Sequence, residues 1–338
     1  MHEAMFWTAL ADGGVRCELC RLHCRIDEGQ RGHCQVRENI AGVLYTLNYG
    51  LAVANNIDPI EKKPLFHVYP GSKSYSVAAM GCNFHCLHCQ NASISQVNPQ
   101  INDIVGSRLM PEKIVAQAVA AGCKSIAYTY TEPTVFYEYA YATAQLAHAA
   151  GLANIFVTNG YIAPEPLRQL APILTAANVD LKGFNPDFYR KVCGAKLEQV
   201  MQSLLLYREL GIWLEVTTLI IPGYNDSSEE LVKLAGFIVD KLGADTPWHV
   251  SAFYPTYKLL DAPPTSPETL QRAQQIGFDA GLNHVYVGNL RSGAGEDTFC
   301  PACHAVLIER RRFAVTSNKI RHGLCPVCGA QIAGVGLD

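Results

Sequence analysis

The chain has 338 residues, of which 49% are hydrophobic and 17% charged, and its net charge at neutral pH is −3. This length supports one large hydrophobic core with small appendages, and the weak charge excludes a general electrostatic preference for nucleic acid or anionic membranes. No apolar run reaches membrane-spanning length, and residues 1–10 lack the cationic start and long apolar stretch of a signal peptide, so we expect a soluble cytoplasmic protein.

The first 73 residues form a cysteine-rich leader, which we expect to be irregular because its prolines favour ordered loop over helix. Four of its thiols follow the pattern Cys-x2-Cys-x3-Cys-x9-Cys, with His23 and His33 as reserve ligands. Four thiolates suit structural zinc and an auxiliary iron–sulfur cluster equally, so the spacing leaves both open. The leader cysteines are Cys17, Cys20, Cys24 and Cys34.

Residues 74–295 alternate between short β-rich runs and helical segments, which implies parallel βαβ units. Such units form either a partial (β/α) barrel or an open, doubly wound sheet. Pro111 marks one helix start, and Ser227 with Glu230 predicts a capping box at another. The expected strands are 74–80, 125–130, 154–158, 178–181, 212–221, 249–253 and 284–287, and the expected helices are 111–122, 134–150, 164–174, 197–210, 227–242 and 267–281.

The informative polar motifs each follow an expected strand. They are the cysteine loop 82–89, Glu132, the Asn159-Gly160 pair, Lys182 and residues 222–226. In a barrel the loops after the strands build one shared site, so this coincidence favours the barrel.

The central loop carries three cysteines, Cys82, Cys86 and Cys89, with no fourth at close spacing. A structural zinc site or an electron-transfer cluster normally takes four protein ligands, so three thiolates leave one metal position open. An open iron on a [4Fe-4S] cluster is what radical chemistry with S-adenosylmethionine (SAM) requires: the cofactor chelates that iron, accepts one electron and yields a hydrogen-abstracting 5′-deoxyadenosyl radical. The alternatives are a zinc site completed by His85 or His88, and a non-catalytic zinc or iron scaffold.

The tail, residues 296–338, carries two Cys-Pro-x-Cys knuckles that predict a zinc ribbon, or a rubredoxin-like iron with the same four sulfurs. So short a segment needs stabilisation beyond its hydrophobic core, and metal binding can provide it. We expect the basic stretch 310–312 to be a solvated face rather than a nucleic-acid site. The tail cysteines are Cys300, Cys303, Cys325 and Cys328.

Four further positions have two interpretations each. Glu132 is either a capping carboxylate or an acceptor for the SAM ammonium, and Asn159 either a turn residue or a ribose contact. Asp180 and Lys182 lie on one face of a strand and form either a salt bridge or a contact to a carboxylate of substrate or cofactor. His249 is structural or a proton donor. The isolated Cys123 and Cys193 are expected in the core.

Over its whole length the chain resembles the radical SAM enzymes of the AmmeMemoRadiSam system, relatives of pyruvate formate-lyase activating enzyme. The resemblance is carried by five motifs: Asp-Pro-Ile-Glu-Lys-Lys-Pro-Leu (58–65), Gly-Cys-Asn-Phe-His-Cys-Leu-His-Cys-Gln-Asn (81–91), Tyr-Thr-Glu-Pro (130–133), Thr-Asn-Gly (158–160) and Asp-Leu-Lys-Gly-Phe (180–184).

The resemblance implies an α/β fold with a partial (β/α)6 radical SAM barrel, flanked by the leader and the zinc-ribbon or rubredoxin-like tail. It implies cluster ligation by Cys82, Cys86 and Cys89. Cofactor contacts would come from Phe84, Glu132, Asn159, Asp180 and Lys182, the last also catalytic, and from His88 where the superfamily usually has an aromatic residue.

The resemblance also implies association with Memo-like and AMMECR-like proteins. Radical chemistry needs an electron donor such as flavodoxin or ferredoxin. A glycyl-radical activase is one version of the function, and the substrate does not follow from the motifs.

Overall fold

The computed structural model describes residues 1–98, 103–290 and 295–338. By its internal contacts the chain divides into two units. Unit 1 is Met1–Asp58, Lys73–Ala176 and Glu209–Ile212, and unit 2 is Pro59–Ser72, Ala177–Arg208 and Trp213–Asp338. The division into residues 1–73, 74–295 and 296–338 stays a prediction. In the described part of the chain, no helix combines the length and apolar character needed to cross a bilayer.

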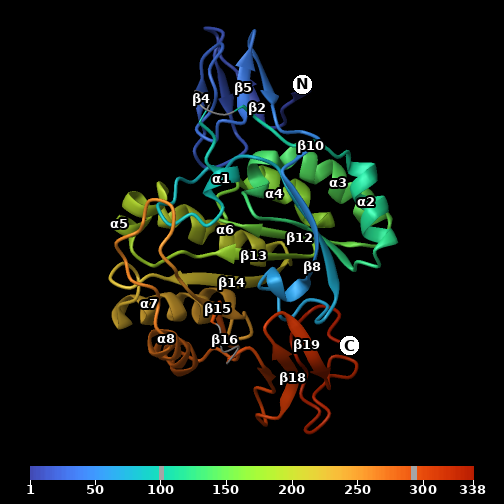
Figure 1. Cartoon of the computed structure of the whole chain (residues 1–338), viewed down its shortest axis with the longest axis vertical. Coiled ribbons are helices and arrows are strands. Elements are labelled where there is room, and N and C mark those ends of the chain that lie inside the picture. The colour runs from blue at the N-terminus through green and yellow to red at the C-terminus, as the bar shows by residue number, and fades with distance from the viewer. Residues whose placement is uncertain (99–102, 291–294) are drawn as a thin grey trace. The chain divides into compact units, whose positions relative to one another are not determined.

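We expected an irregular leader, but it folds into short antiparallel strands (Figure 1). Most of these strands have two to four residues, too few for a period-two pattern to stand out in the sequence. Gly13 at φ 82° and Gly42 at φ 81° make the turns between them. One sheet is β1 (His2–Glu3), β6 (Val43–Thr46) and β5 (Arg37–Ile40), and the other is β2 (Trp7–Ala9), β3 (Val15–Cys17) and β4 (Arg25–Ile26).

Unit 1 also holds four strands in the order β8-β9-β11-β12, with β9, β11 and β12 parallel. The residues of β11 are buried throughout, as in a strand covered on both faces. Helix α2 contacts β9 and β11, and α3 contacts β11 and β12. The strands are β8 (Ala54–Pro59), β9 (Lys73–Ala78), β11 (Ser125–Tyr128) and β12 (Ala153–Thr158), and the helices α2 (Pro111–Ala120), η2 (Pro133–Phe136), α3 (Tyr137–Ala149), α4 (Pro164–Leu170) and η3 (Ala171–Ile173). Three short elements complete the unit: the pair β7 (Leu51–Ala52) and β10 (Ser107–Arg108), and α1 (Ala92–Ser95).

Unit 2 continues the alternation with strands in the order β13-β14-β15-β16, of which β14, β15 and β16 are parallel. Helices α7 and α8 pack beside each other, and α8 covers β15 and β16 (Figure 1). Gly277 of α8 allows this approach, since a Cβ there would lie 2.9 Å from the Trp248 ring. The elements are β13 (Ala176–Asp180), α5 (Pro186–Phe188), η4 (Tyr189–Cys193), α6 (Leu197–Glu209), β14 (Trp213–Ile220), α7 (Ser228–Phe237), η5 (Ile238–Leu242), β15 (Trp248–Ala252), α8 (Pro267–Asp279) and β16 (Val285–Gly288).

The helix predicted at 227–242 begins at the expected residue, but its N-terminal cap is incomplete and its last turn is not α-helical. The Ser227 hydroxyl accepts a hydrogen bond from the Glu230 N–H at 3.3 Å. The Glu230 carboxylate accepts from the Phe184 N–H at 2.7 Å, so the predicted reciprocal capping box is only half formed. After α7 the chain widens into the π-helical turn η5.

The tail forms a three-stranded antiparallel sheet of β17 (Thr298–Phe299), β18 (Val306–Arg311) and β19 (Ala314–Asn318). A small hydrophobic cluster packs with two of its cysteines and consists of Leu307, Ile308, Ile320, Ile332 and Leu337. A core of this size cannot stabilise such a segment alone.

Candidate metal and cofactor site

The three central cysteines lie in the loop between β9 and α1, in unit 1. Cys86 is buried, while Cys82 and Cys89 are half-buried. The Phe84 N–H donates to the Cys82 sulfur at 3.3 Å, and the Ser95 hydroxyl lies 3.1 Å from the Cys89 sulfur. Donors placed on sulfurs favour the thiolate form and hold each ligand in position.

Asn159, at the end of β12, joins this loop to a buried carboxylate. Its Nδ2 donates to Asn83 Oδ1 at 2.8 Å and lies 3.7 Å from the Cys82 sulfur. Its backbone N–H donates to Glu132 Oε2 at 2.8 Å. The structure therefore brings Cys82, Glu132 and Asn159, predicted from separate motifs, into one constellation.

The Glu132 carboxylate is buried and caps η2. Its Oε1 accepts from the Thr134 N–H at 3.0 Å and from the hydroxyls of Thr134 and Thr158 at 2.6 and 2.7 Å. Burial raises the pKa of this carboxyl, and the hydrogen bonds from Asn159, Thr134 and Thr158 oppose the rise. Burial also raises the pKa of the Cys82 thiol well above its usual value, and the nearby Glu132 charge adds to it.

Phe84 and His88, predicted beside the cofactor, are both buried, at 1% and 4% exposure. The Phe84 ring meets the Tyr161 ring edge to face, with centroids 5.0 Å apart. The Gln96 amide donates to the Phe84 carbonyl at 3.1 Å. Other protein groups enclose both residues, and their contact with an adenine ring stays a prediction.

A second set of contacts, which the sequence did not reveal, ties two of the family motifs to the cysteine loop. The Asp58 carboxylate accepts from the Ser76 hydroxyl at 2.8 Å and from the Tyr130 hydroxyl. Tyr130 has φ 67°, and its carbonyl accepts from Asn91 Nδ2 at 2.7 Å. These bonds hold the 130–133 turn beside the end of the cysteine motif.

Asp180 and Lys182 lie in unit 2 and pair with each other. Lys182 Nζ lies 2.8 Å from Asp180 Oδ2, with the two side chains 16% and 35% exposed. The Lys182 backbone is also held, by Tyr189 Oη at 2.9 Å and Asn225 Nδ2 at 2.6 Å. The salt-bridge interpretation therefore describes their contacts within this unit.

His249 is a buried partner of Glu215, with His249 Nε2 2.6 Å from Glu215 Oε2. Glu215 also accepts from the N–H groups of Phe66 and His67, at 3.0 and 2.8 Å. Burial alone raises the pKa of Glu215, but the hydrogen bond and charge of His249 and the charge of His67 lower it overall. Sequence analysis missed Glu215; the signal was a lone carboxylate within the buried strand β14.

Arg310 corrects the expectation of a solvated basic face at 310–312, because its side chain is fully buried. Its guanidinium donates to the Phe66 carbonyl at 2.8 Å and to the Thr298 hydroxyl at 2.7 Å. It also lies 4.3 Å from the centre of the Phe66 ring and 3.7 Å from Glu61. A run of three arginines therefore includes one that anchors the tail to residues 61–66.

The four tail cysteines form a compact group whose sulfurs all lie within 4.8 Å of one another. The Cys300–Cys328 and Cys303–Cys325 sulfur distances are 3.6 and 3.7 Å. A tetrahedral ion with bonds of about 2.3 Å to sulfur holds its ligands about 3.8 Å apart. The tail therefore carries a four-cysteine site for a single metal ion.

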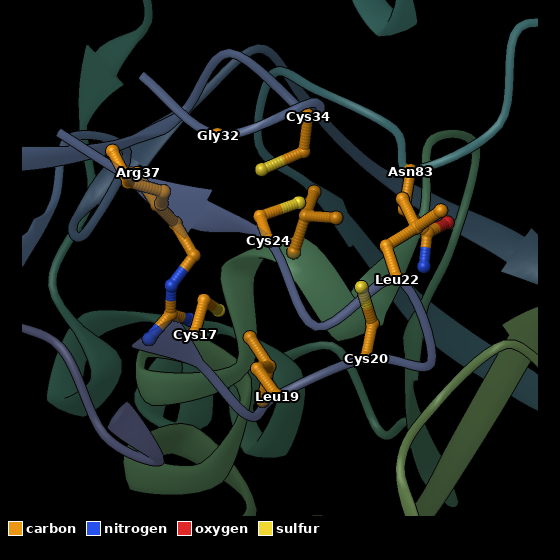
Figure 2. Close-up of a pocket in the computed structure, with 11 residues that line it drawn as sticks. Cys17, Leu19, Cys20, Leu22, Cys24, Gly32, Cys34, Arg37 and Asn83 are labelled. Carbon is orange, nitrogen blue, oxygen red and sulfur yellow. The ribbon is translucent and has the colours of Figure 1, made fainter. Parts of the chain in front are cut away.

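The four leader cysteines line one pocket of about 320 Å³, including its part open to solvent (Figure 2). Cys17 and Cys20 are buried, and Cys24 and Cys34 half-buried. The predicted ligand set is thus brought together.

Known proteins relate to this chain as follows. The model of the Radical SAM superfamily matches residues 77–235. The Uncharacterized protein MJ0808 of Methanocaldococcus jannaschii is 49% identical over 334 residues, covering 98% of this chain and 99% of that protein. Residues 77–235 therefore form a radical SAM domain. A protein with this domain is an enzyme, and the superfamily implies a [4Fe-4S] cluster and SAM.

Two solved structures show the same fold as this radical SAM enzyme. A radical SAM methyltransferase from Sphaerobacter thermophilus aligns with TM-score 0.51 at 19% identity, over 66% of this chain and 68% of its own. Streptococcus suis SuiB bound to S-adenosylmethionine aligns with TM-score 0.53 at 14% identity, over 72% of this chain and 56% of its own. At such identities the likeness concerns the fold alone.

The central loop fits the implied cluster. It offers three thiols from one turn, and donors from Phe84, Ser95 and Asn159 lie at two of the sulfurs. Beside it, Asn83 Nδ2 is buried without a hydrogen-bond partner among the described residues. Such a donor suits a sulfur of this loop or of the leader pocket, which Asn83 also lines.

Proposed function

We propose that this enzyme cleaves SAM reductively at a [4Fe-4S] cluster held by Cys82, Cys86 and Cys89, and that the resulting 5′-deoxyadenosyl radical abstracts hydrogen from a substrate. When bound, the cluster would pass one electron from an external donor to SAM, which breaks the C–S bond. The position of Asn159, between the Cys82 sulfur and the Glu132 carboxylate, carries the proposal.

The protein's own residues orient the cofactor. Three donors share Glu132 Oε1, so that oxygen is fully used, whereas Oε2 accepts one bond, from the Asn159 N–H. A carboxylate oxygen offers about two acceptor positions. Oε2 can therefore accept one bond from the SAM ammonium without loss of the cap. Buried Phe84 and His88 would exclude water around the adenine, which protects a radical from stray hydrogen donors.

Asp180 and Lys182 are proposed contacts to the ribose and methionine part of SAM. Their ion pair fixes the Lys182 ammonium, so a carboxylate from cofactor or substrate would meet a preset charge. His249, by contrast, is fully engaged by Glu215 inside unit 2, and we assign it no proton transfer.

We further propose the narrower identity that the motifs imply: an AmmeMemoRadiSam-system enzyme with a partial (β/α)6 barrel, zinc in the tail, and a cytoplasmic setting. A flavodoxin or ferredoxin would supply electrons, and Memo-like and AMMECR-like proteins would be partners. The proposed family rests on the 58–65, 81–91, 130–133, 158–160 and 180–184 motifs, and tail zinc rests on the knuckles 300–303 and 325–328.

The test is 5′-deoxyadenosine formation by anaerobically reconstituted protein given SAM and dithionite. We expect product from the wild type and from Cys123→Ala, a buried thiol outside the three clusters, and none from Cys89→Ala. Equal product from Cys89→Ala would refute the assigned ligand. No product from wild type of verified cluster content would favour the metal-scaffold function.

A further inference from the structure

The leader pocket contains the features of a second metal site within unit 1. Figure 2 shows the cysteine side chains of β3 and the loops after β3 and β4 arranged around one space. Apolar side chains line much of the pocket, among them Leu19, Leu22 and Val135. Apolar walls around thiols exclude water and lower the local dielectric, as in sites for redox clusters.

The spread of the sulfurs separates this site from the tail. All four tail sulfurs lie within 4.8 Å of one another. Among the described residues of the leader, no three sulfurs lie that close together. A single zinc ion would hold them about 3.8 Å apart. A cubane distributes four thiolates over four irons and so takes ligands that are spaced more widely.

Two buried N–H groups lining the pocket have no hydrogen-bond partner among the described residues, Arg37 Nε and Asn83 Nδ2. Their side chains are 2% and 0% exposed. Buried donors are nearly always satisfied, and N–H groups directed at sulfurs are a common way for proteins to set cluster potentials. Both donors thus indicate a ligand rich in acceptors.

The charge of the pocket also suits a cluster with four thiolates. The Arg37 guanidinium lies close enough to Cys17 and Cys34 for direct electrostatic interaction, and it also pairs with Glu138 at 3.0 Å. Asn83 directly follows Cys82 and accepts from Asn159 at 2.8 Å. The same side chain therefore borders the leader pocket and the central loop.

We infer that Cys17, Cys20, Cys24 and Cys34 bind a second [4Fe-4S] cluster. The chain supplies a ligand for each iron, so this cluster has no open position for SAM. The inference rests on the leader pocket and does not depend on the SAM chemistry proposed above.

The test uses the full chain with the central ligands removed, Cys82→Ala/Cys86→Ala/Cys89→Ala, reconstituted anaerobically with iron and sulfide. We expect this variant to retain about four irons and four sulfides per chain beyond any tail metal, with the Mössbauer and reduced-state EPR signals of a [4Fe-4S] cluster. Adding Cys20→Ala/Cys24→Ala should abolish those signals, while adding Cys123→Ala should leave them unchanged.

Two further outcomes are decisive. A triple variant without labile sulfide, or with zinc bound at the leader cysteines, overturns the inference. Because the triple variant keeps all leader cysteines, its spectra do not depend on whether leader variants fold. Adding Asn83→Ala to it should shift the EPR signal; an unchanged signal would remove Asn83 from the cluster's surroundings. Failure of deoxyadenosine formation in the wild type would not affect any of these results.

Discussion

The leader and the tail each contain four cysteines and one buried arginine, yet their sulfurs are spaced differently. The tail sulfurs lie within 4.8 Å of one another, whereas no three sulfurs of the described leader do. Both arginines are buried with Nε lacking a hydrogen-bond partner among the described residues. Arg37 lines the leader pocket, and Arg310 donates to the Phe66 carbonyl. The same number of cysteines therefore gives two different sulfur spacings, and the different metals proposed for the two sites rest on that difference.

The two regions also depend on metal to different degrees. The tail has only a small hydrophobic cluster of its own, so its ion must supply much of the folding free energy. The leader pocket is bordered by residues from elsewhere in unit 1, including Asn83 and Val135. We expect the leader backbone to persist without its cluster.

The largest expected effect is removal of the tail metal. Cys325→Ala or chelation should unfold residues 298–338, since metal binding in small zinc peptides is worth on the order of 10–16 kcal/mol. Hydrogen exchange should show loss of protection in β18 and β19, with β11 unchanged. The Cys123→Ala variant controls for loss of a thiol, and retained protection in β18 would show that the tail folds without metal.

The second effect concerns the buried arginine of the leader. Arg37→Met leaves the Glu138 carboxylate buried and unpaired, which should cost about 3–5 kcal/mol in urea unfolding. The control is Arg25→Met, whose exposed pair with Asp12 has side chains 53% and 54% exposed and should change stability by about 1 kcal/mol or less. Equal effects of the two variants would mean that the Arg37–Glu138 pair is not desolvated.

The third effect is a loss of stability in acid, centred on the contact between residues 66–67 and the tail. His67 donates from Nδ1 to the Ala333 carbonyl at 2.8 Å, and burial lowers the pKa of His67 below 6.5. The pKa of Glu215 is also lowered, although burial alone raises it, because His249 and His67 interact with its charge.

Groups with depressed folded-state pKa values stabilise fully above their unfolded values and lose that stabilisation as pH falls. We therefore expect stability to decline below about pH 6.5 because of His67, and further below about pH 4.3 because of Glu215, by about 1.4 kcal/mol per unit of pKa depression for each group. His67→Gln should flatten the decline measured by urea unfolding between pH 7 and pH 5. An unchanged slope would assign the acid sensitivity elsewhere.

The smallest effect comes from single side-chain amides. Asn83→Ala loses the bond from Asn159, and Asn318→Ala in the tail loses its 2.7 Å bond to the Leu337 carbonyl. Each should cost about 1 kcal/mol. Iron retention after reconstitution should fall only for Asn83→Ala; equal loss in both variants would show a general effect of destabilisation.

The sequence by itself determined the local features. The spacing of Cys82, Cys86 and Cys89, the alternation of strands and helices, and the Ser227 cap depend on neighbours a few residues away, so a linear pattern can reveal them. The knuckles at 300–303 and 325–328 likewise predicted the tail site, because each supplies two ligands from one turn.

Only the tertiary structure decided the features that join distant segments. In the sequence Arg310 looks like one of three surface arginines, but in the structure it is buried against Phe66 and Thr298. In the sequence Glu215 looks like an isolated charge in a strand, but in the structure it pairs with His249 and accepts from the backbone of residues 66–67. Sulfur spacing in the leader depends on how β3, β4 and Asn83 fold around the pocket. Burial and electrostatic pairing are properties of neighbours in space, which sequence spacing does not encode.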